Sequence, residues 1–206
     1  MNKSNYGNQK LSSIFNQIAD LVMLNLLFVI SCIPVITIGT AIISLLGTVF
    51  ERMENPDTYI WKSYRNAFKR NLKQGILLWL IILAVLTLLH TDMVIINSVK
   101  PAMSGILMVM LGIFMVLVVL MAIYAFPLQA KHPAGIKMLL RNSFFISMAY
   151  LPYSLLMLGI FLVCVVITFW SANLLQEMLF IWLLGGFSAM AYLQAKIINV
   201  LLEKIQ

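Results

Sequence analysis

Five long stretches of this chain contain no charged residue, and they constrain its fold more than any other feature. They lie at 21–50, 74–89, 101–130, 142–176 and 178–195. Each approaches or exceeds the roughly 20 apolar residues that an α-helix needs to cross a bilayer. A spanning β-barrel would show short segments of alternating polarity instead. The chain is therefore predicted to be an all-α, polytopic integral membrane helix bundle, with a single membrane domain over 1–206.

The composition supports this class and excludes others. Hydrophobic residues make up 62% of the chain and charged residues 10%, whereas a soluble domain is usually about 25% charged. With so few charges, a soluble enzyme of this size could not cover its surface with polar groups. The two cysteines lie inside apolar runs and show no metal-ligand spacing. No cofactor, metal site or disulfide framework is expected.

Four of the predicted crossings follow directly from the apolar runs. They lie at about 75–96, 102–126, 142–168 and 174–200, and Pro152 is expected to kink the third, because proline removes a backbone donor. The first run has 30 residues; as one helix it would be about 45 Å long, too long for a core of about 30 Å. Pro34 interrupts this run, which favours a hairpin of two helices at about 12–31 and 34–52.

The distribution of positive charge helps to choose between six crossings and five. Lys and Arg concentrate on the cytoplasmic side of membrane proteins. With six crossings and both termini inside, 13 of the 14 Lys and Arg residues are cytoplasmic and only Lys100 lies outside. With five crossings, Lys3 and Lys10 also lie outside, which leaves 11 of the 14 inside. We prefer six crossings and keep five as the open alternative.

A basic segment before the crossing at 75–96 has the pattern of an amphipathic helix at about 58–73. At about 100° per residue, apolar side chains fall on one arc and cations on the other. The cations are Lys62, Arg65, Lys69, Arg70 and Lys73. Such a helix is typical of the membrane interface, so we expect contact with anionic lipid headgroups or with a partner protein. The net charge of +7 is thus assigned to these partners and not to nucleic acid.

One acidic residue, Asp20, lies well inside an apolar stretch, within the predicted helix at about 12–31. A carboxylate in a membrane segment usually faces the bundle interior or a water-filled cavity. Asn25 and Thr37 could partner it, so the three residues are a candidate intramembrane polar site. The alternative is that these polar groups only hold helices together. Because the sequence has no catalytic motif or metal-ligand set, we expect no enzymatic activity.

Three segments in the N-terminal part resemble a known family. The segments DLVMLNLL at 20–27, IPVITIG at 33–39 and YRNAFKRNLKQ at 64–74, followed by Trp79, resemble the YesL family of bacterial membrane proteins. Phe28 and Leu72 depart from residues that are usual there. The resemblance covers about 15–80 and implies no catalytic residues, because the family has no established function.

The genes of this family often lie beside those of sugar ABC transporter permeases. The resemblance therefore implies a multi-pass protein of the bacterial plasma membrane with an accessory or regulatory role in carbohydrate ABC transport. A permease of such a transporter is the expected protein partner. The alternative is that the chain is a small transporter or channel in its own right.

Overall fold

The structure, a computed structural model, describes the backbone of residues 3–99 and 101–205, and their side chains except those of 3–14, 16, 99, 101–104, 172–173 and 205. Every regular element within these residues is a helix. In chain order they are α1 (Lys3–Cys32), the 3-10 turn η1 (Val35–Thr37), α2 (Ile38–Glu54), α3 (Ile60–Val99), α4 (Pro101–Lys131), α5 (Ile136–Ala149), α6 (Leu151–Phe169), α7 (Ala172–Ile181), the π-helical segment η2 (Trp182–Gly186) and α8 (Phe187–Ile205).

The helices confirm the predicted class of all-α membrane protein. Within the described residues, five segments are long and apolar enough to cross a bilayer: Val35–Glu54, Ile60–Ser98, Gly105–Lys131, Leu151–Phe169 and Leu174–Lys204. The apolar stretch Gln17–Cys32 of α1 is shorter. Three cations used in the charge comparison, Lys3, Lys10 and Lys100, lie outside the described side chains.

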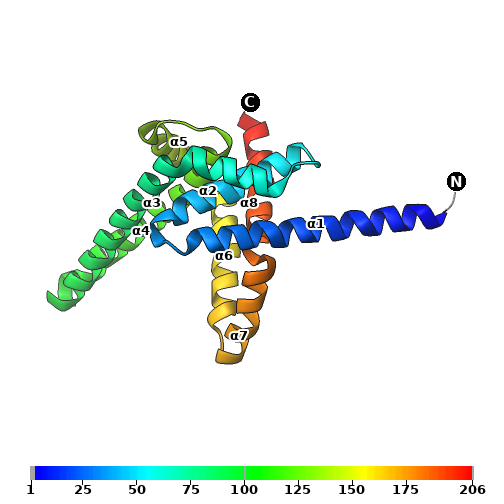
Figure 1. Ribbon diagram of the computed structural model, residues 1–206. Helices are drawn as coiled ribbons and strands as arrows, with labels where there is room; N and C mark the ends of the chain where they lie inside the picture. Colours follow the sequence, from blue (N-terminus) through cyan, green and yellow to red (C-terminus); the bar gives the residue numbers. More distant parts are fainter. Residues whose placement is uncertain (1–2, 100, 206) are drawn as a thin grey trace.

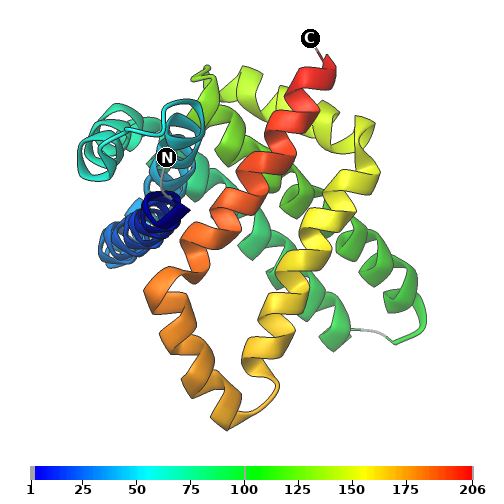
Figure 2. The same cartoon turned by 90° about the vertical axis from the view of Figure 1, so that its right-hand side faces the viewer.

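The molecule divides into a protein-enclosed part around α2 and two hairpins that project from it. The enclosed part, here the core layer, comprises residues 20–82, 120–147 and 188–202, and it holds every buried apolar side chain of the described residues except Met157. The projecting hairpins comprise 83–119 and 151–187. They extend to the same side of the molecule, away from α5 (Figures 1 and 2).

α2 lies at the centre of the core layer. It packs against α1, α3, α4 and α8. In the segment Val35–Glu54, 56% of the most apolar 18-residue stretch is buried. The same share is 17% for Ile60–Ser98 and 6% for Gly105–Lys131. α2 is therefore surrounded by protein, whereas the projecting hairpins expose their apolar side chains.

α2 and α3 cross at two glycines. A Cβ on Gly39 would clash with the Gly75 carbonyl oxygen, and a Cβ on Gly75 would lie 2.6 Å from Thr40 Oγ1. The Thr40 hydroxyl donates to the Leu72 carbonyl at 3.2 Å. Glycine at both positions allows the backbones to approach this closely.

α2 runs antiparallel to the first half of α3 only. At one end of the pair, the Ser63 hydroxyl donates to the Glu51 carboxylate at 2.5 Å. At the other end, Gly39 meets Gly75. α2 therefore ends its contact with α3 near Gly75, and the second half of α3 continues beyond it into a projecting hairpin (Figure 1).

The structure joins two elements that the sequence treats as separate. The predicted interfacial helix at 58–73 and the crossing at 75–96 form the single helix α3, of 40 residues. No proline lies within Ile60–Val99, and one glycine in a helix costs only about 1 kcal/mol. The amphipathic pattern of the first half and the apolar pattern of the second are thus compatible with one continuous helix.

The predicted crossing at 142–168 is divided rather than kinked. α5 ends at Ala149, α6 begins at Leu151, and Pro152 occupies the first turn of α6. Proline is well tolerated there, because the first turn of a helix has no intrahelical partner for its N–H groups. The crossing at 174–200 is also interrupted, by η2.

A second proline, Pro127, lies inside α4, where its missing N–H would leave the carbonyl of Ile123 without its usual donor. The side-chain amide of Gln194, on α8, donates to that carbonyl at 2.8 Å. This bond explains how α4 continues to Lys131, beyond the predicted end at residue 126.

Candidate functional site

The polar residue Asn25 of α1 joins two distant parts of the chain inside the core layer. Its side chain is fully buried, and its Nδ2 donates to the carbonyls of Trp182 and Leu183 at 2.8 and 2.7 Å. Its Oδ1 accepts from the Ser188 N–H at 3.1 Å. The turns of a π-helical segment are wider than those of an α-helix, so these two carbonyls and this N–H lack the backbone partners that they would have in an α-helix. Asn25 supplies the partners, so all of its hydrogen-bonding groups are occupied.

Aromatic side chains surround this connection. Phe187 lies between Phe28 and Trp182, with ring centroids 5.1 and 4.8 Å away. The indole N–H of Trp182 donates to the Thr168 hydroxyl at 3.0 Å, which ties α6 to η2. A Cβ on Gly186 would lie 2.7 Å from the Trp182 ring, so glycine leaves room for the indole.

Asp20, the acidic residue of the predicted polar site, forms an ion pair. Arg52, at the end of α2, donates to its carboxylate at 2.5 Å. The side chain of Arg52 is 25% exposed and that of Asp20 is 32% exposed. The pair neutralises both charges at the open end of the α1–α2 hairpin. Among the described residues, Asn25 and Thr37 bond to backbone carbonyls and not to this carboxylate.

Thr37 has a local role. Its hydroxyl donates to the carbonyls of Ser31 and Pro34, both at 2.7 Å, and so closes the turn between α1 and α2. The three predicted site residues therefore occupy three separate places: the open end of the hairpin, η2 and the turn. The structure does not bring them together into one site.

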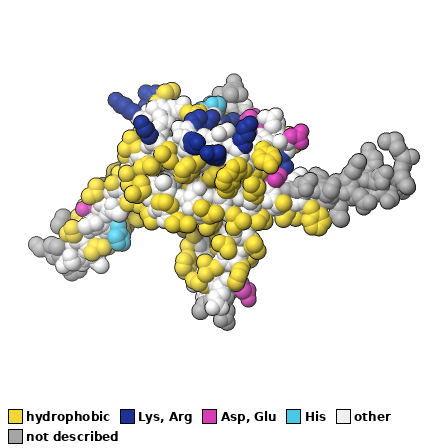
Figure 3. Space-filling view, viewed as in Figure 1, with side chains coloured by type: hydrophobic (Ala, Val, Ile, Leu, Met, Phe, Trp, Pro, Cys, Tyr) yellow, Lys and Arg dark blue, Asp and Glu magenta, His cyan; other side chains and the backbone are white. Residues whose placement is uncertain are grey.

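The five cations of the predicted amphipathic helix form a surface that we call the basic face: Lys62, Arg65, Lys69, Arg70 and Lys73, all exposed. The ion pair of Asp20 with Arg52 is the one salt bridge among the described residues, so none of the five is neutralised by a described acid. The space-filling view shows the Lys and Arg side chains gathered on the side opposite the projecting hairpins (Figure 3).

The apolar arc of the same helix is mostly covered by protein and not left free for lipid. Ile60, Tyr64 and Ala67 are buried, and Phe68 is half-buried, where α2 packs against α3. This arrangement corrects the expectation of an isolated interfacial helix whose apolar face lies on the membrane. The sequence pattern is amphipathic, but another helix of the same chain occupies the apolar side.

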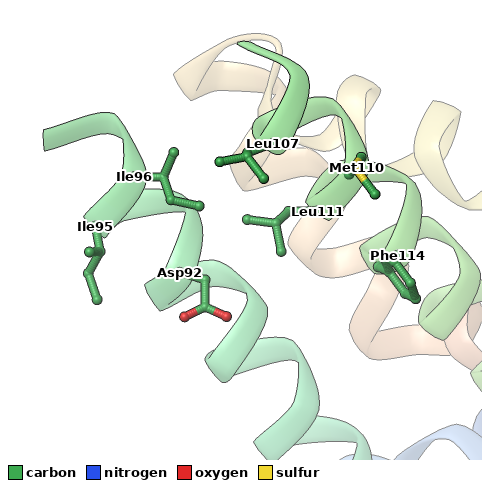
Figure 4. Close-up of a pocket in the computed structure, with 7 residues that line it drawn as sticks. All are labelled: Asp92, Ile95, Ile96, Leu107, Met110, Leu111 and Phe114. Carbon is green, nitrogen blue, oxygen red and sulfur yellow. The ribbon is translucent and has the colours of Figure 1, made fainter. Parts of the chain in front are cut away.

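Two shallow cavities lie along the α3–α4 hairpin. One, of about 270 Å³, is lined by Asp92 and six apolar side chains of α3 and α4 (Figure 4). The other, of about 360 Å³, is lined by α3 residues that include His90. His90 and Asp92 thus face different cavities. No cluster of three or more His, Cys, Asp or Glu that could hold a metal occurs among the described residues.

Several polar contacts were not predicted from the sequence. They involve Gln74 with Gln129, Trp182 with Thr168, and Ser188 with the Leu21 carbonyl. The one available signal was the pair Gly185-Gly186 before Ser188, which indicates close helix packing. Gln129, Thr168 and Ser188 are isolated amides and hydroxyls outside any motif, and Gln74, although it ends the motif at 64–74, carries no sign of its partner in the sequence.

The fold and its apolar helices define an all-α, multi-pass membrane protein. Residues 21–93 match a family model described as "Protein of unknown function, DUF624". The matched part contains Asn25, both crossing glycines and the basic face, and ends inside the second half of α3. No curated protein and no solved structure matches the chain.

Proposed function

We propose that this protein is a non-enzymatic accessory or regulatory component of carbohydrate ABC transport in a bacterial plasma membrane, with both termini cytoplasmic. In this proposal the basic face binds an acidic cytoplasmic surface of the sugar permease complex. The observation that carries the proposal is that five exposed cations lie within 12 consecutive residues without a described acidic partner.

Electrostatic complementarity is a common basis for such contacts, because it steers association and selects partners. Other cations of the same protein have partners of their own. Lys131, for example, donates to Asn199 Oδ1 at 2.6 Å and lies 5.4 Å from the ring centre of Phe50. The side chains of the basic face have no such contacts among the described residues, so they are available to a partner.

The link to carbohydrate transport rests on the resemblance of 20–27, 33–39 and 64–74 to the YesL family. The same segments contribute to the α1–α2 turn, the glycine crossing and the basic face. A shared requirement for this arrangement would explain why these segments carry the resemblance.

A small transporter or channel is the alternative function. It would need a polar path through the bundle, and Asp20, Asn25 and Thr37 were the candidate lining. Each of them is engaged with a different structural partner, and the cavities on the α3–α4 hairpin are mostly apolar. These observations favour a binding role over a transport role.

The proposal can be tested by gentle detergent extraction and affinity purification from native membranes, followed by mass spectrometry. We expect subunits of a sugar ABC permease to co-purify with the wild-type protein. A double variant, Lys62→Glu with Lys69→Glu, should reduce their recovery at least tenfold. The matched control, Lys137→Glu with Lys196→Glu, changes the net charge equally on other exposed sites and should retain recovery.

Equal loss in both double variants would indicate a nonspecific charge effect and contradict a docking role for the basic face. Absence of any permease subunit from the wild-type sample would contradict the proposed partner. Sugar or ion flux through the purified protein alone in proteoliposomes, abolished by Asp20→Asn, would favour the transporter instead.

A further inference from the structure

The length of α3 shows that only one half of it can cross a bilayer. Its 40 residues correspond to a length of about 60 Å, which is twice the roughly 30 Å thickness of a bilayer's hydrocarbon core. The first half carries the five cations of the basic face, and placing even one cation at the bilayer centre costs about 3 kcal/mol or more. Residues 74–89 contain no charge and expose Leu77, Leu80 and Leu88. The second half is therefore the crossing.

α2 pairs with the half of α3 that does not cross. The Glu51–Ser63 hydrogen bond and the Gly39–Gly75 contact place both ends of α2 beside residues 63–75 of α3. The α1–α2 turn consequently lies at the start of the α3 crossing, near Lys73, and not at its far end. A hairpin that crossed the bilayer twice would place this turn at the far end.

α1 lies across the helices that cross the bilayer. In Figure 1 it runs at a large angle to α6, α7 and α8. Asn25 bonds to η2 and to Ser188 of α8, and the Leu21 carbonyl accepts from the Ser188 hydroxyl. The α6–α7 turn carries Trp170, 76% exposed, and tryptophan is typical of the membrane interface. From Ser171 to Ser188 the chain rises by about 26 Å. This rise places α1 near the face of the bilayer's hydrocarbon core that lies opposite the α6–α7 turn.

The side of α1 that faces away from the protein is apolar. Five apolar side chains on this side are 39–65% exposed and recur at helical spacing. They form the apolar stripe of α1: Phe15, Ile18, Met23, Leu26 and Ile30. The opposite side of α1 packs on the core layer through Leu24 and Phe28. A helix in water would leave this apolar stripe unfavourably hydrated, whereas a helix lying in a leaflet buries it among acyl chains.

We propose that the α1–α2 hairpin is a lipid-binding element within the cytoplasmic leaflet, with the apolar stripe of α1 against acyl chains. The chain then crosses the bilayer four times, through the second half of α3, α4, α6 and the segment from α7 into α8. The basic face points to the cytosol, on the side away from the bilayer. The inference rests on the membrane class and is independent of the identity of any protein partner.

Four crossings sort the charges as well as six do. A hairpin that enters and leaves on the same side moves no cation, so 13 of the 14 Lys and Arg residues remain cytoplasmic in both topologies. The charge distribution therefore excludes neither, and the contacts of α2 with α3 distinguish them.

Cysteine accessibility tests the position of the α1–α2 turn. In a background with Cys32→Ala and Cys164→Ala, single cysteines replace the exposed residues Ile33 and Ser98. Six crossings place both on the outer side of the membrane. We expect a membrane-impermeant maleimide to label Ser98→Cys in intact cells and to leave Ile33→Cys unlabelled. Labelling of Ile33→Cys from the outside would overturn the proposal.

Spin labels measure the depth of the hairpin directly, in vesicles of phosphatidylethanolamine and phosphatidylglycerol. A nickel chelate that cannot cross the bilayer should relax a label at Ile33 more strongly from the side of the basic face; the reverse would overturn the proposal. A label at Ile30 should respond to lipid-dissolved oxygen. Dipolar broadening between Ile30 labels would instead show that a second copy covers the apolar stripe, and would overturn the lipid contact.

Discussion

The core layer and the projecting hairpins are both built from apolar helices, but the two regions differ in how much of each helix is buried by protein. Gly105–Lys131 is the most apolar of the segments that could cross a bilayer, and it is the least buried, at 6%. Val35–Glu54 is among the least apolar, and it is the most buried, at 56%. Lipid does not penalise exposed apolar side chains, so burial inside a membrane protein follows packing and polarity instead of hydrophobicity.

Polar side chains mark the difference between the two regions. Thr40, Ser44 and Thr48 follow one side of α2 at four-residue spacing, are fully buried, and each donates to a backbone carbonyl. The lipid-facing surface of the hairpins consists mainly of Leu, Ile, Val, Phe and Met. The core layer is therefore held by close packing and hydrogen bonds, and substitutions there should cost far more than in the hairpins.

The largest contrast should come from matched leucines. Leu46 is 1% exposed in α2, and Leu107 is 45% exposed in α4. Leu46→Ala should destabilise the fold by about 3 kcal/mol, because it leaves a cavity, whereas Leu107→Ala should change stability by less than about 0.5 kcal/mol. Unfolding in sodium dodecyl sulfate, followed by circular dichroism, measures both. Equal losses would show that the hairpins are also packed against protein.

Matched glycines give the next contrast. A Cβ on Gly39 would clash with the backbone of α3, whereas a Cβ on Gly112 in α4 would meet nothing within 4 Å. Gly39→Ala should cost about 2.5 kcal/mol through overpacking, and Gly112→Ala should be neutral or slightly stabilising because alanine favours helix. Thermal unfolding in mild detergent reports both values. A neutral Gly39→Ala would mean that α2 and α3 do not cross as closely as described.

Two asparagines of the matched segment separate a buried polar role from a surface role. Asn25→Ala removes the partners of the Trp182 and Leu183 carbonyls and of the Ser188 N–H, which should cost about 2 kcal/mol. Asn66 is exposed, and Asn66→Ala should have little effect. Hydrogen exchange of the Ser188 amide should accelerate in the first variant only. Unchanged exchange would contradict the role of Asn25 in holding η2.

The helical class and the apolar crossings in the projecting hairpins could be predicted from the sequence, because lipid imposes continuous apolar runs on any crossing helix. Pro34 and Pro152 were also informative, since each lies next to a helix boundary in the structure. The enclosure of α2 could not be predicted. A helix surrounded by protein and a helix surrounded by lipid can have the same apolar composition, and only tertiary contacts distinguish them.

The candidate polar site was harder to predict for a related reason. The partners of Asn25 are backbone groups of η2 and of Ser188 just after it. They become available only where the helix widens, so no side chain in the sequence indicates them. Asp20 looked isolated because its partner, Arg52, lies 32 residues away and approaches only when the hairpin closes. The five cations of the basic face, by contrast, follow local helical spacing, so their exposure along one helix could be predicted from the sequence.

The smallest expected effect concerns the boundary between α4 and α8, where one hydrogen bond compensates for a proline. Gln194→Ala should cost about 1 kcal/mol, because the Ile123 carbonyl loses its donor. In a Pro127→Ala background, residue 127 regains an N–H that bonds to Ile123 within α4, so the same Gln194→Ala substitution should then cost almost nothing. A double-mutant cycle of unfolding free energies measures this coupling. Strictly additive effects would show that Gln194 stabilises the core layer by packing and not by satisfying the carbonyl that Pro127 leaves free.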